Sequence, residues 1–374
     1  MRIAMNIAPD GSRPRADLRD PASFDHVGRD AGANFAAGEI LAELADSDPR
    51  IVVGCADLTY VTRLAIFGAR HPKRLLYYGI SERNMLGAAA GLATTGHIPY
   101  MCTFASFSAI LGYENIRTDL AYPRLPVRIL ATHAGLSMGF FGTSHHATED
   151  LAALRAVAGL RIVSPCDPAS TRALIRQTVD EPGPVYFRIG RGRESAVYDR
   201  EPRFEPGLAS VVRDGSSLLI VATGIMVQEA LAAAETLAGQ GISATVVDVH
   251  TIKPFPDEHL AALAARHQAV LTVEEHTIEG GLGTMTVEAL AAHGVRVPLF
   301  KHGLRDEYAL VGPPTRLYRY YGLEREGIAL VGERLLAHPA GHPVGHPVGP
   351  RLITEPLWTA DDRARVYAQY GVRK

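Results

Sequence analysis

A single acidic residue, Glu82, stands between a strand end and a helix of small and apolar residues in the stretch YYGISERNMLGAAAGLA (77–93). A carboxylate at the start of a helix often does no more than compensate the helix dipole. A strand-to-loop junction is, however, also the place where open α/β sheets bind their ligands. Glu82 is therefore a candidate for acid–base chemistry if other reactive side chains share its location.

Two further groups of side chains follow the next two apolar strands. Phe104 and Phe107 come at the end of IPYMCTF (98–104), and the TSHH cluster (143–146) follows VRILATHAG (127–135). Taken singly, the two phenylalanines could be core residues, and the adjacent histidines could simply lead into a helix. Because parallel strands end at the same edge of a sheet, we expect the carboxylate, the rings and the histidines to meet in one crevice.

Alternating strands and helices must position these side chains. From residue 34 onward, apolar runs that predict strands alternate with patterns that predict helices, which indicates an α/β fold with a mainly parallel sheet. In the first half, predicted strands cover 50–58, 98–104, 127–135, 161–167 and 183–190, and predicted helices cover 83–96, 108–122, 148–159 and 168–180. In the second half, strands at 216–224, 243–250 and 269–276 alternate with helices at 226–241, 257–267 and 283–294.

Composition divides the chain into two α/β domains with irregular ends. Residues 1–30 are rich in Asp, Arg, Pro and Gly and predict an arm rather than a packed element. Charge and proline in ESAVYDREPRFEPGL (194–208) indicate a linker between a domain at 31–193 and a second at 209–337. Residues 338–374 begin with HPAGHPVGHPVGP, which is typical of a stiff proline-rich linker or, through its histidines, of a metal-binding tract, and a short helix follows.

The composition is that of an ordinary globular protein and argues against several classes. The 374 residues are 47% hydrophobic and 21% charged, which provides ample chain for a buried core. A formal net charge of −2 gives no basic field for nucleic acid, and we expect no membrane span. Cys55, Cys102 and Cys166 are too widely spaced for a disulfide framework or a zinc knuckle. We therefore expect a cytoplasmic protein that acts on small molecules.

Three blocks of this sequence resemble the C-terminal half of the transketolase family, in the family's order. GISERNMLGAAAGLATTGHIPYMCTFASFSAI resembles the pyrimidine-binding segment, and ATHAGLSMGFFGTSHHATEDLAALRAVAGLRIVSPCD resembles the active-site loop and strand after it. VEEHTIEGGLG (273–283) resembles the signature of the family's C-terminal domain. The resemblance spans roughly residues 30–335. It implies a thiamine-diphosphate enzyme with a pyrimidine-binding α/β domain followed by a transketolase C-terminal α/β domain.

The resemblance implies that the pyrimidine end of thiamine diphosphate binds at the junctions described above. Glu82 matches the family glutamate that hydrogen-bonds N1′ of the aminopyrimidine, and a buried carboxyl group favours sharing a proton with that nitrogen. Phe107 would stack on the pyrimidine with Phe104 behind it, because an aromatic ring fixes another ring without competing for its nitrogens. Asp57 matches a family acid near the pyrimidine edge.

The resemblance also assigns residues to the substrate. His145 matches the histidine of the family's GPTHQ loop, here GTSHH, and can move protons to and from the ketol oxygens. His133 and Arg188 match positions that hold a sugar phosphate, and a guanidinium suits phosphate because it donates paired hydrogen bonds. A salt bridge at the sheet edge is the alternative role for Arg188.

Three substrate positions depart from the family pattern. Phe141 stands where the family has an acid that contacts a sugar hydroxyl, Asn34 where it has a phosphate-binding arginine, and Val61 where it has a serine. Fewer phosphate and hydroxyl contacts therefore remain than in a transketolase of ordinary sugars. We expect a donor or acceptor other than a common pentose phosphate.

The segment by which the family binds the diphosphate is missing from this sequence. Family members hold Mg²⁺ through a GDG…N segment in an N-terminal domain, and the RDG at 213–215 lacks both the first glycine and the asparagine block. The resemblance therefore implies a partner, an N-terminal transketolase subunit that carries the GDG segment and binds most of the Mg²⁺ or Ca²⁺. We expect an α2β2 heterotetramer with this chain as β, and no metal site on this chain.

The leading interpretation is thus the C-terminal subunit of a split transketolase, which transfers a two-carbon ketol unit from a ketose or ketose phosphate donor to an acceptor. The β subunit of a 2-oxoacid dehydrogenase E1, or a hybrid that passes the unit to a lipoyl or carrier domain, shares the two-domain plan. A non-catalytic scaffold subunit has no need to keep Glu82, Phe107 and His145 together. A 1-deoxyxylulose-phosphate synthase would keep both halves on one chain.

Overall fold

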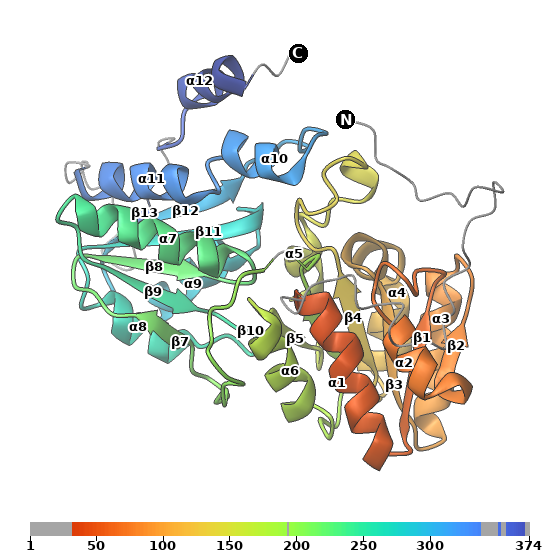
Figure 1. Ribbon diagram of the computed structural model, residues 1–374. Helices are drawn as coiled ribbons and strands as arrows, with labels where there is room; N and C mark the ends of the chain where they lie inside the picture. Colours follow the sequence, from red (N-terminus) through yellow and green to blue (C-terminus); the bar gives the residue numbers. More distant parts are fainter. Residues whose placement is uncertain (1–31, 193, 338–350, 353–356, 371–374) are drawn as a thin grey trace.

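The computed structural model describes residues 32–192, 194–337, 351–352 and 357–370. The predicted arm at 1–30 and the histidine–proline repeat lie outside these residues. Within them, two α/β units stand side by side, each built on one sheet (Figure 1). The structure confirms the predicted α/β class.

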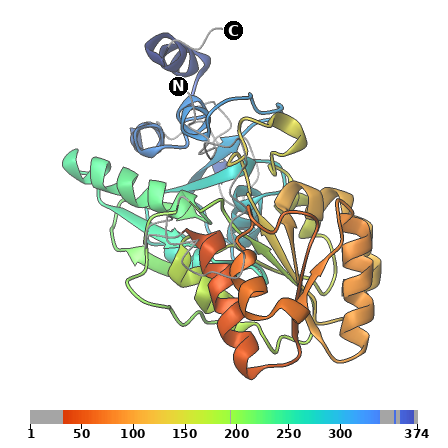
Figure 2. The same ribbon diagram turned by 45° about the vertical axis from the view of Figure 1, so that its right-hand side comes forward.

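The first unit carries a seven-stranded sheet, counted over the described residues, in the order β10-β5-β6-β4-β3-β1-β2. Every neighbouring pair is parallel except β10 with β5, so the strands of this unit end at one edge. α1 and α6 cover one face of the sheet and α3 covers the other (Figure 2). The elements are α1 (Ala33–Ser47), β1 (Ile51–Cys55), α2 (Ala65–Arg70), η2 (Pro72–Arg74), β2 (Leu75–Tyr77), α3 (Glu82–Thr94), β3 (Ile98–Phe104), η3 (Phe107–Leu111), α4 (Tyr113–Asn115), η4 (Ile116–Ala121), β4 (Arg128–Thr132), η5 (Gly142–Ser144), α5 (Asp150–Leu154), β5 (Arg161–Val163), α6 (Pro168–Gln177) and β6 (Val185–Arg188).

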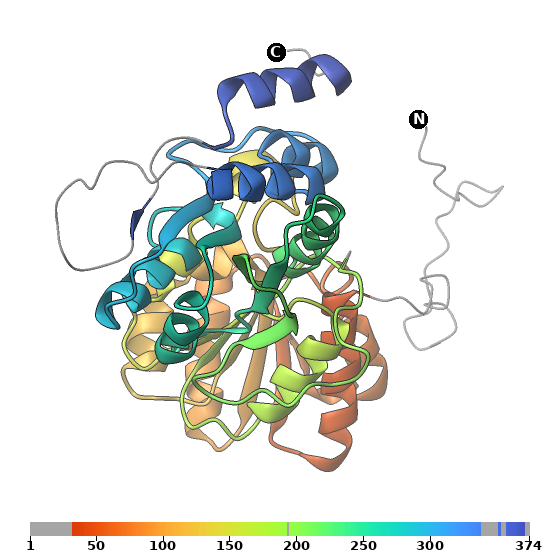
Figure 3. The ribbon, with the colours of Figure 1, turned by 90° about the vertical axis from the view of Figure 1, so that its left-hand side faces the viewer.

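The second unit carries a six-stranded sheet over the same described ranges, in the order β13-β12-β11-β8-β9-β7. All of its neighbouring pairs are parallel except β7 with β9. α7 and α11 pack together on one face, and α8 and α9 lie on the other (Figure 3). The elements are β7 (Ser210–Arg213), β8 (Leu218–Ala222), α7 (Met226–Gly239), β9 (Ala244–Asp248), β10 (Thr251–Lys253), α8 (Asp257–Ala264), β11 (Ala269–Thr277), α9 (Leu282–Ala292), β12 (Pro298–Leu304), α10 (Pro314–Tyr320), α11 (Arg325–Ala337), β13 (Arg351–Leu352) and α12 (Ala360–Tyr370).

The helix predicted at 108–122 is not one regular α-helix. It is divided into two π-helical segments, η3 and η4, around the single turn α4. The amide of Gly112 donates to the carbonyl of Phe107 at 3.2 Å, five residues back, and a Cβ at Gly112 would strike Leu86. The wider turn therefore begins at Phe107, one of the predicted cofactor residues.

Other elements also differ from the prediction. The helix predicted at 148–159 ends as α5 after five residues, because the chain then tightens into a turn in which the amide of Val157 donates to the carbonyl of Leu154. β12 was not predicted, since lysine, histidine and glycine interrupt the apolar pattern of PLFKHGL.

A strand from the second half of the chain joins the first sheet. β10 pairs antiparallel with β5, and the amide of Ser164 donates to the carbonyl of His250 at 2.9 Å. Buried side chains from both units, among them Ile162 and Leu260, also belong to one continuous core. The two units thus share a sheet and a core, which fixes the second unit against the first.

Candidate active site

Four aromatic rings meet where β3 and β4 end. Phe104 closes β3, Phe107 opens η3, His133 follows β4, and His145 follows η5. Ring centroids lie 4.4 Å apart for Phe104 and His133, 5.6 Å for Phe104 and Phe107, and 5.1 Å for Phe107 and His145. Ring pairs at such separations attract one another. The structure thus brings together the two predicted cofactor rings and the two predicted substrate histidines.

Glu82 is the first residue of α3 and contacts β3 near the strand end from which the ring cluster begins. Its side chain is 6% exposed, and the hydroxyl of Thr103 donates to its Oε1 at 3.3 Å. Thr103 directly precedes Phe104 on β3, so the carboxylate lies at the strand end that also carries the Phe104 ring. Among the described residues, no protein donor binds Oε2 of Glu82. Oε2 is not one of the described buried atoms that lack a hydrogen-bond partner, so a ligand can reach it and donate a hydrogen bond to it.

His133 is buried, and its imidazole is neutral at ordinary pH. It is 3% exposed, and burial, together with the positive charges of Arg191 and Arg63, lowers its pKa to about 3. Its Nδ1 lies 3.0 Å from the hydroxyl oxygen of Thr132. The backbone at His133 is left-handed, with φ of 60°, which is a strained conformation for a residue with a Cβ. This fixed, uncharged imidazole can hydrogen-bond a substrate oxygen but carries no charge to bind an anion.

His145 is more accessible than His133. The hydroxyl oxygen of Ser144 lies 2.9 Å from its Nδ1, and the rings of Phe141 and His145 have centroids 4.8 Å apart. Burial lowers the pKa of His145 below the ordinary value of 6.5. The imidazole is therefore neutral at pH 7 and able to accept a proton.

Asp57 lies at the same edge of the sheet in a different environment. It follows β1, the strand beside β3, and its side chain is exposed. Its φ of 59° is a left-handed conformation that aspartate adopts more readily than most residues. Within the described part of the chain, no contact ties Asp57 to Glu82 or to the ring cluster.

The structure separates Arg188 from the ring cluster. The residue is 2% exposed, and its Nε donates to the two carboxylate oxygens of Asp150 at 3.2 and 3.0 Å. Its Nη1 lies 3.5 Å from Oε1 of Glu275, and its Nη2 donates to the carbonyls of Ala147 and Glu275. Every guanidinium nitrogen thus has a protein acceptor, and a phosphate would have to displace buried carboxylates. This geometry favours the salt-bridge alternative, although the ion pairs are buried between the units rather than at a sheet edge.

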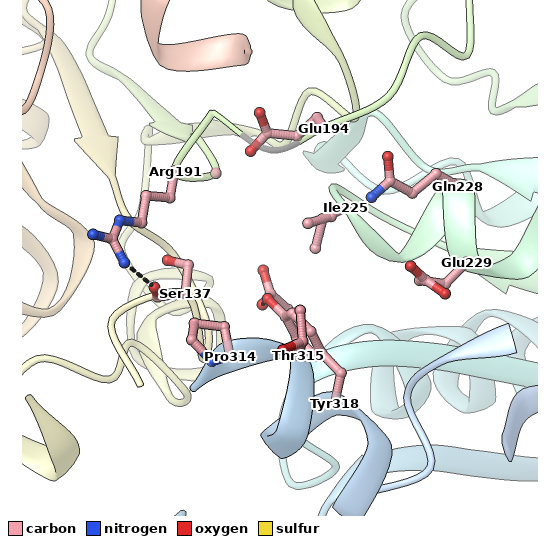
Figure 4. Close-up of a pocket in the computed structure, with 11 residues that line it drawn as sticks. Ser137, Arg191, Glu194, Ile225, Gln228, Glu229, Pro314, Thr315 and Tyr318 are labelled. Carbon is pink, nitrogen blue, oxygen red and sulfur yellow. Dashed lines mark hydrogen bonds between the residues drawn. The ribbon is translucent and has the colours of Figure 1, made fainter. Parts of the chain in front are cut away.

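Arg191, which the sequence pattern did not single out, lies close enough to His133 for its charge to act on that histidine. Its Nη1 donates to the carbonyl of Ser137 at 3.1 Å, and its charge helps to lower the pKa of His133. It lines a cavity of about 150 Å³ between the two units (Figure 4). A signal was present in RIGRGR, which places Arg191 beyond the last residue of β6, where a side chain can reach a ligand.

Two of the positions that depart from the family pattern carry largely exposed apolar side chains. Phe141 is 59% exposed and Val61 is 46% exposed. Neither side chain offers a hydrogen bond to a sugar hydroxyl.

The part of the chain that the structure describes holds no group of three His, Cys, Asp or Glu side chains that could bind a metal ion. Over the same residues, no helix combines the length and apolar character needed to cross a membrane. The cysteines at 55, 102 and 166 are buried and free.

Comparisons with known proteins match both units to one family. The family described as "Transketolase, pyrimidine binding domain" matches residues 33–194, and "Transketolase, C-terminal domain" matches residues 207–328. A protein of Methanocaldococcus jannaschii named as a transketolase C-terminal section is 40% identical over 294 residues, which cover 78% of this chain and 92% of that protein. The chain belongs to the transketolase family.

Two further transketolase relatives align over nearly their whole length. A 6-deoxy-6-sulfo-D-fructose transketolase subunit of Clostridium is 37% identical over 290 residues, which cover 78% of this chain and 90% of that subunit. A solved structure described as a split gene transketolase, inactive beta4 tetramer, superposes with a TM-score of 0.75 at 39% identity and covers 82% of this chain and 98% of its own. These relatives therefore correspond to both units of the present transketolase chain.

Glu82 and the ring cluster fit the pyrimidine end of thiamine diphosphate, the cofactor of transketolases. The cofactor's aminopyrimidine needs an acid for its ring nitrogen and a flat apolar surface for its face. Glu82 has a carboxylate oxygen without a protein donor in the described ranges, and Phe107 of the ring cluster is only partly buried. The residues present therefore match this half of the cofactor.

Proposed function

We propose that this chain is the C-terminal, β subunit of a thiamine-diphosphate-dependent transketolase and that it transfers a two-carbon ketol unit from a ketose donor to an acceptor. The observation that carries the proposal is that Glu82 contacts β3 at the strand end where the cluster of Phe104, Phe107, His133 and His145 gathers. In this cluster, acid–base side chains that come from separate strand ends lie close to the same aromatic rings. A scaffold subunit would not require this combination.

Each of these side chains has its own task in the proposal. The carboxyl group of Glu82 shares a proton with the pyrimidine nitrogen, and Phe107 packs against the pyrimidine with Phe104 behind it. When bound, thiamine diphosphate supplies the electron sink for cleavage of the carbon–carbon bond beside a ketone. His145 takes a proton from the donor's hydroxyl and returns it to the acceptor's oxygen, while His133 orients these oxygens by hydrogen bonding.

A second polypeptide supplies the rest of the site in this proposal. It is an N-terminal transketolase subunit that carries the GDG segment, binds the diphosphate with Mg²⁺ or Ca²⁺, and forms an α2β2 heterotetramer with this chain. Two findings support it: the sequence has no GDG…N segment, and a relative is described as an inactive tetramer of β subunits. In this proposal Asp57 lies near the edge of the bound pyrimidine ring, as the resemblance to the family implies. Free cysteines suit a reducing compartment, so we place the assembly in the cytoplasm.

The proposed donor is a ketose with an anionic group that Arg191, rather than Arg188, binds. Arg191 lines the cavity between the units, its Nη1 donates to the carbonyl of Ser137, and its charge helps to lower the pKa of His133. The guanidinium of Arg188 is paired with two buried carboxylates, those of Asp150 and Glu275. One relative is named for 6-deoxy-6-sulfo-D-fructose, in which a sulfonate replaces a phosphate. We therefore propose an anionic ketose that makes fewer hydroxyl contacts than a pentose phosphate does in ordinary transketolases.

The dehydrogenase E1 alternative and the carrier hybrid have no comparable support. The relatives reported above are named as transketolase sections or subunits. The transketolase reading therefore stands as the one proposed function.

Replacement of Glu82 by glutamine tests this function in the complex with the N-terminal subunit. Exchange of the C2 proton of bound thiamine diphosphate should fall on the order of 10²–10⁴-fold, because a glutamine cannot share a proton with the pyrimidine nitrogen. Glu114→Gln is the control, since Glu114 is 69% exposed and paired with Arg83 at the surface. Wild-type exchange in Glu82→Gln would remove Glu82 from the chemistry and refute the proposal.

A further inference from the structure

A short backbone bridge joins the segments that carry the two active-site histidines. The amide of Gly135 donates to the carbonyl of Ala147 at 3.1 Å, and the amide of Ala147 donates to the carbonyl of Gly135 at 3.0 Å. His133 and His145 each stand two residues before a member of this bridge. Because proton transfer depends on the placement of such groups to within about 1 Å, whatever holds the bridge also governs the histidines.

Glu275, from β11 in the second unit, holds one side of the bridge. Its Oε2 accepts a hydrogen bond from the amide of Leu136 at 3.2 Å. Its carboxylate lies so close to Gly135 that a Cβ added there would collide with it. Glu275 is 3% exposed, so water does not compete for this hydrogen bond.

Arg188 holds the other side of the bridge and ties it to the same glutamate. Its Nη2 donates to the carbonyl of Ala147 at 3.2 Å, and its Nη1 lies 3.5 Å from Oε1 of Glu275. The two sides of the bridge are therefore connected through one buried ion pair as well as through their own hydrogen bonds.

Tyr318, from α10 of the second unit, holds the side chain of Glu275 in place. Its hydroxyl donates to Oε2 of Glu275 at 2.7 Å. Figure 4 shows Tyr318 and Ser137 lining the same cavity, Tyr318 from the second unit and Ser137 from the loop that follows His133. The hydrogen bond between Tyr318 and Glu275 lies within the second unit, and Glu275 in turn reaches the histidine loop of the first unit through the amide of Leu136.

We propose that Glu275 is a positioning residue: through Leu136 and Arg188 it sets the placement of His133 and His145, so that the second unit governs proton transfer to the substrate. This inference rests on the proposed function. Glu275 acts through the bridge and takes no part in forming or breaking substrate bonds.

Two neighbouring buried acids allow a matched test. Glu275→Ala removes the acceptor of the Leu136 amide, whereas Glu275→Gln keeps an acceptor and should restore part of the function. Glu274→Ala is the control, because Glu274 is 1% exposed but accepts from the amides of Leu282 and Gly283 at the start of α9. Each alanine variant thus loses one buried carboxylate, but only the carboxylate of Glu275 contacts the bridge.

The test measures three quantities for each variant. In the complex with the N-terminal subunit, these are ketol transfer from hydroxypyruvate and C2-proton exchange of bound thiamine diphosphate. The third quantity is the set of imidazole NMR signals, recorded on the full chain labelled with ¹⁵N-histidine. Glu275→Ala should lower kcat/KM by about ten- to hundredfold and shift the signals of His133 and His145, while C2-proton exchange remains at the wild-type rate. Glu274→Ala should leave all three at wild-type values.

Wild-type ketol transfer in Glu275→Ala would overturn the inference. Equal losses of ketol transfer and of C2-proton exchange would also overturn it, because they would indicate general damage to the fold. If Glu275→Ala does not fold, Tyr318→Phe decides instead: it should slow ketol transfer with unchanged exchange, and wild-type transfer would contradict the positioning role. A wild-type complex that shows neither transfer nor exchange would refute the proposed function, and the histidine signals would still test the placement by Glu275.

Discussion

Phe107 and His145 meet edge to face, with ring centroids 5.1 Å apart and ring planes at 65°. The phenylalanine comes from η3 after β3 and the histidine from the loop after β4, so two neighbouring strand ends converge on this contact. Phe141 packs against the same histidine with a centroid distance of 4.8 Å. These apolar rings withdraw the imidazole from water, which explains why its pKa is lowered.

Replacing Phe141 by alanine should raise the pKa of His145 toward 6.5, because water then reaches the imidazole. The acid limb of the pH profile of ketol transfer should move to higher pH with it, since the neutral imidazole accepts the proton. NMR titration of the full chain and pH profiles of the complex measure the two effects. Phe140→Ala is the control, because Phe140 is the adjacent ring and is 62% exposed. An unchanged His145 pKa in Phe141→Ala would contradict this explanation.

Replacing Arg188 by methionine should lower the free energy of unfolding by about 3–5 kcal/mol, because Asp150 and Glu275 would remain buried without their cation. Arg172→Met is the control, since the ion pair of Arg172 with Glu39 is partly exposed and should contribute about 0.2–1 kcal/mol. Denaturant unfolding of both variants makes the comparison. Equal losses of unfolding free energy in the two variants would show that Arg188 stabilises the fold no more than a surface residue does. Arg188 would then again be a candidate for binding the substrate phosphate.

Replacing Arg191 by alanine should weaken binding of the anionic donor. The KM for a ketose phosphate or sulfonate should rise by about ten- to hundredfold, because a charged hydrogen-bond donor is lost. The KM for hydroxypyruvate, which has no phosphate or sulfonate, should change much less. Steady-state kinetics of the complex with both donors compare the effects, and a similar rise for both would remove Arg191 from anion recognition.

Hydrophobic pattern alone predicted much of the first sheet. A run such as IPYMCTF is apolar on both faces, as a central parallel strand must be, and β3 occupies it. The helix that begins at Glu82 also followed from its small and apolar residues. By contrast, β10 has only three residues and pairs with a strand of the other unit. So short a strand depends on tertiary packing and leaves no local signal.

The difference between Arg188 and Arg191 could not be read from the sequence. They stand three residues apart in RIGRGR, at the end of the same apolar run. Arg188 is buried because it ends β6 and meets Asp150 and Glu275, whose positions depend on how the two units pack. No local pattern reports such distant partners, so the resemblance to the family assigned the phosphate to Arg188, whose guanidinium is paired with Asp150 and Glu275 in the structure.

Asp248 should make the stability of this protein depend on pH. Burial raises its pKa to about 7, and the hydroxyl of Tyr198 donates to its Oδ2 at 2.8 Å. A carboxyl group whose pKa is raised by folding contributes its full stability below the unfolded value of 3.8 and loses it as pH rises through about 7. Replacing Asp248 by asparagine should therefore flatten the fall in unfolding free energy over this range, by up to about 1.4 kcal/mol per pH unit.

Urea unfolding of wild type and Asp248→Asn at several pH values measures this slope. Burial also raises the pKa values of Glu274 and Glu275 to about 7. These two residues affect the pH dependence of wild type and variant alike, so the difference in slope between the two proteins reports Asp248 alone. Asp180→Asn, at a side chain that is 79% exposed, is the control. Identical slopes for wild type and Asp248→Asn would contradict the prediction.

In the proposed function, this chain holds half of a thiamine-diphosphate site, the half formed by Glu82 and the ring cluster. Calorimetric titration with thiamine diphosphate and Mg²⁺, performed on the chain alone and on its complex with the N-terminal subunit, tests the claim most directly. We predict tight binding by the complex and weak or undetectable binding by the chain alone, since the described residues include no group that could hold the metal. Micromolar binding by the chain alone would contradict the split-site account.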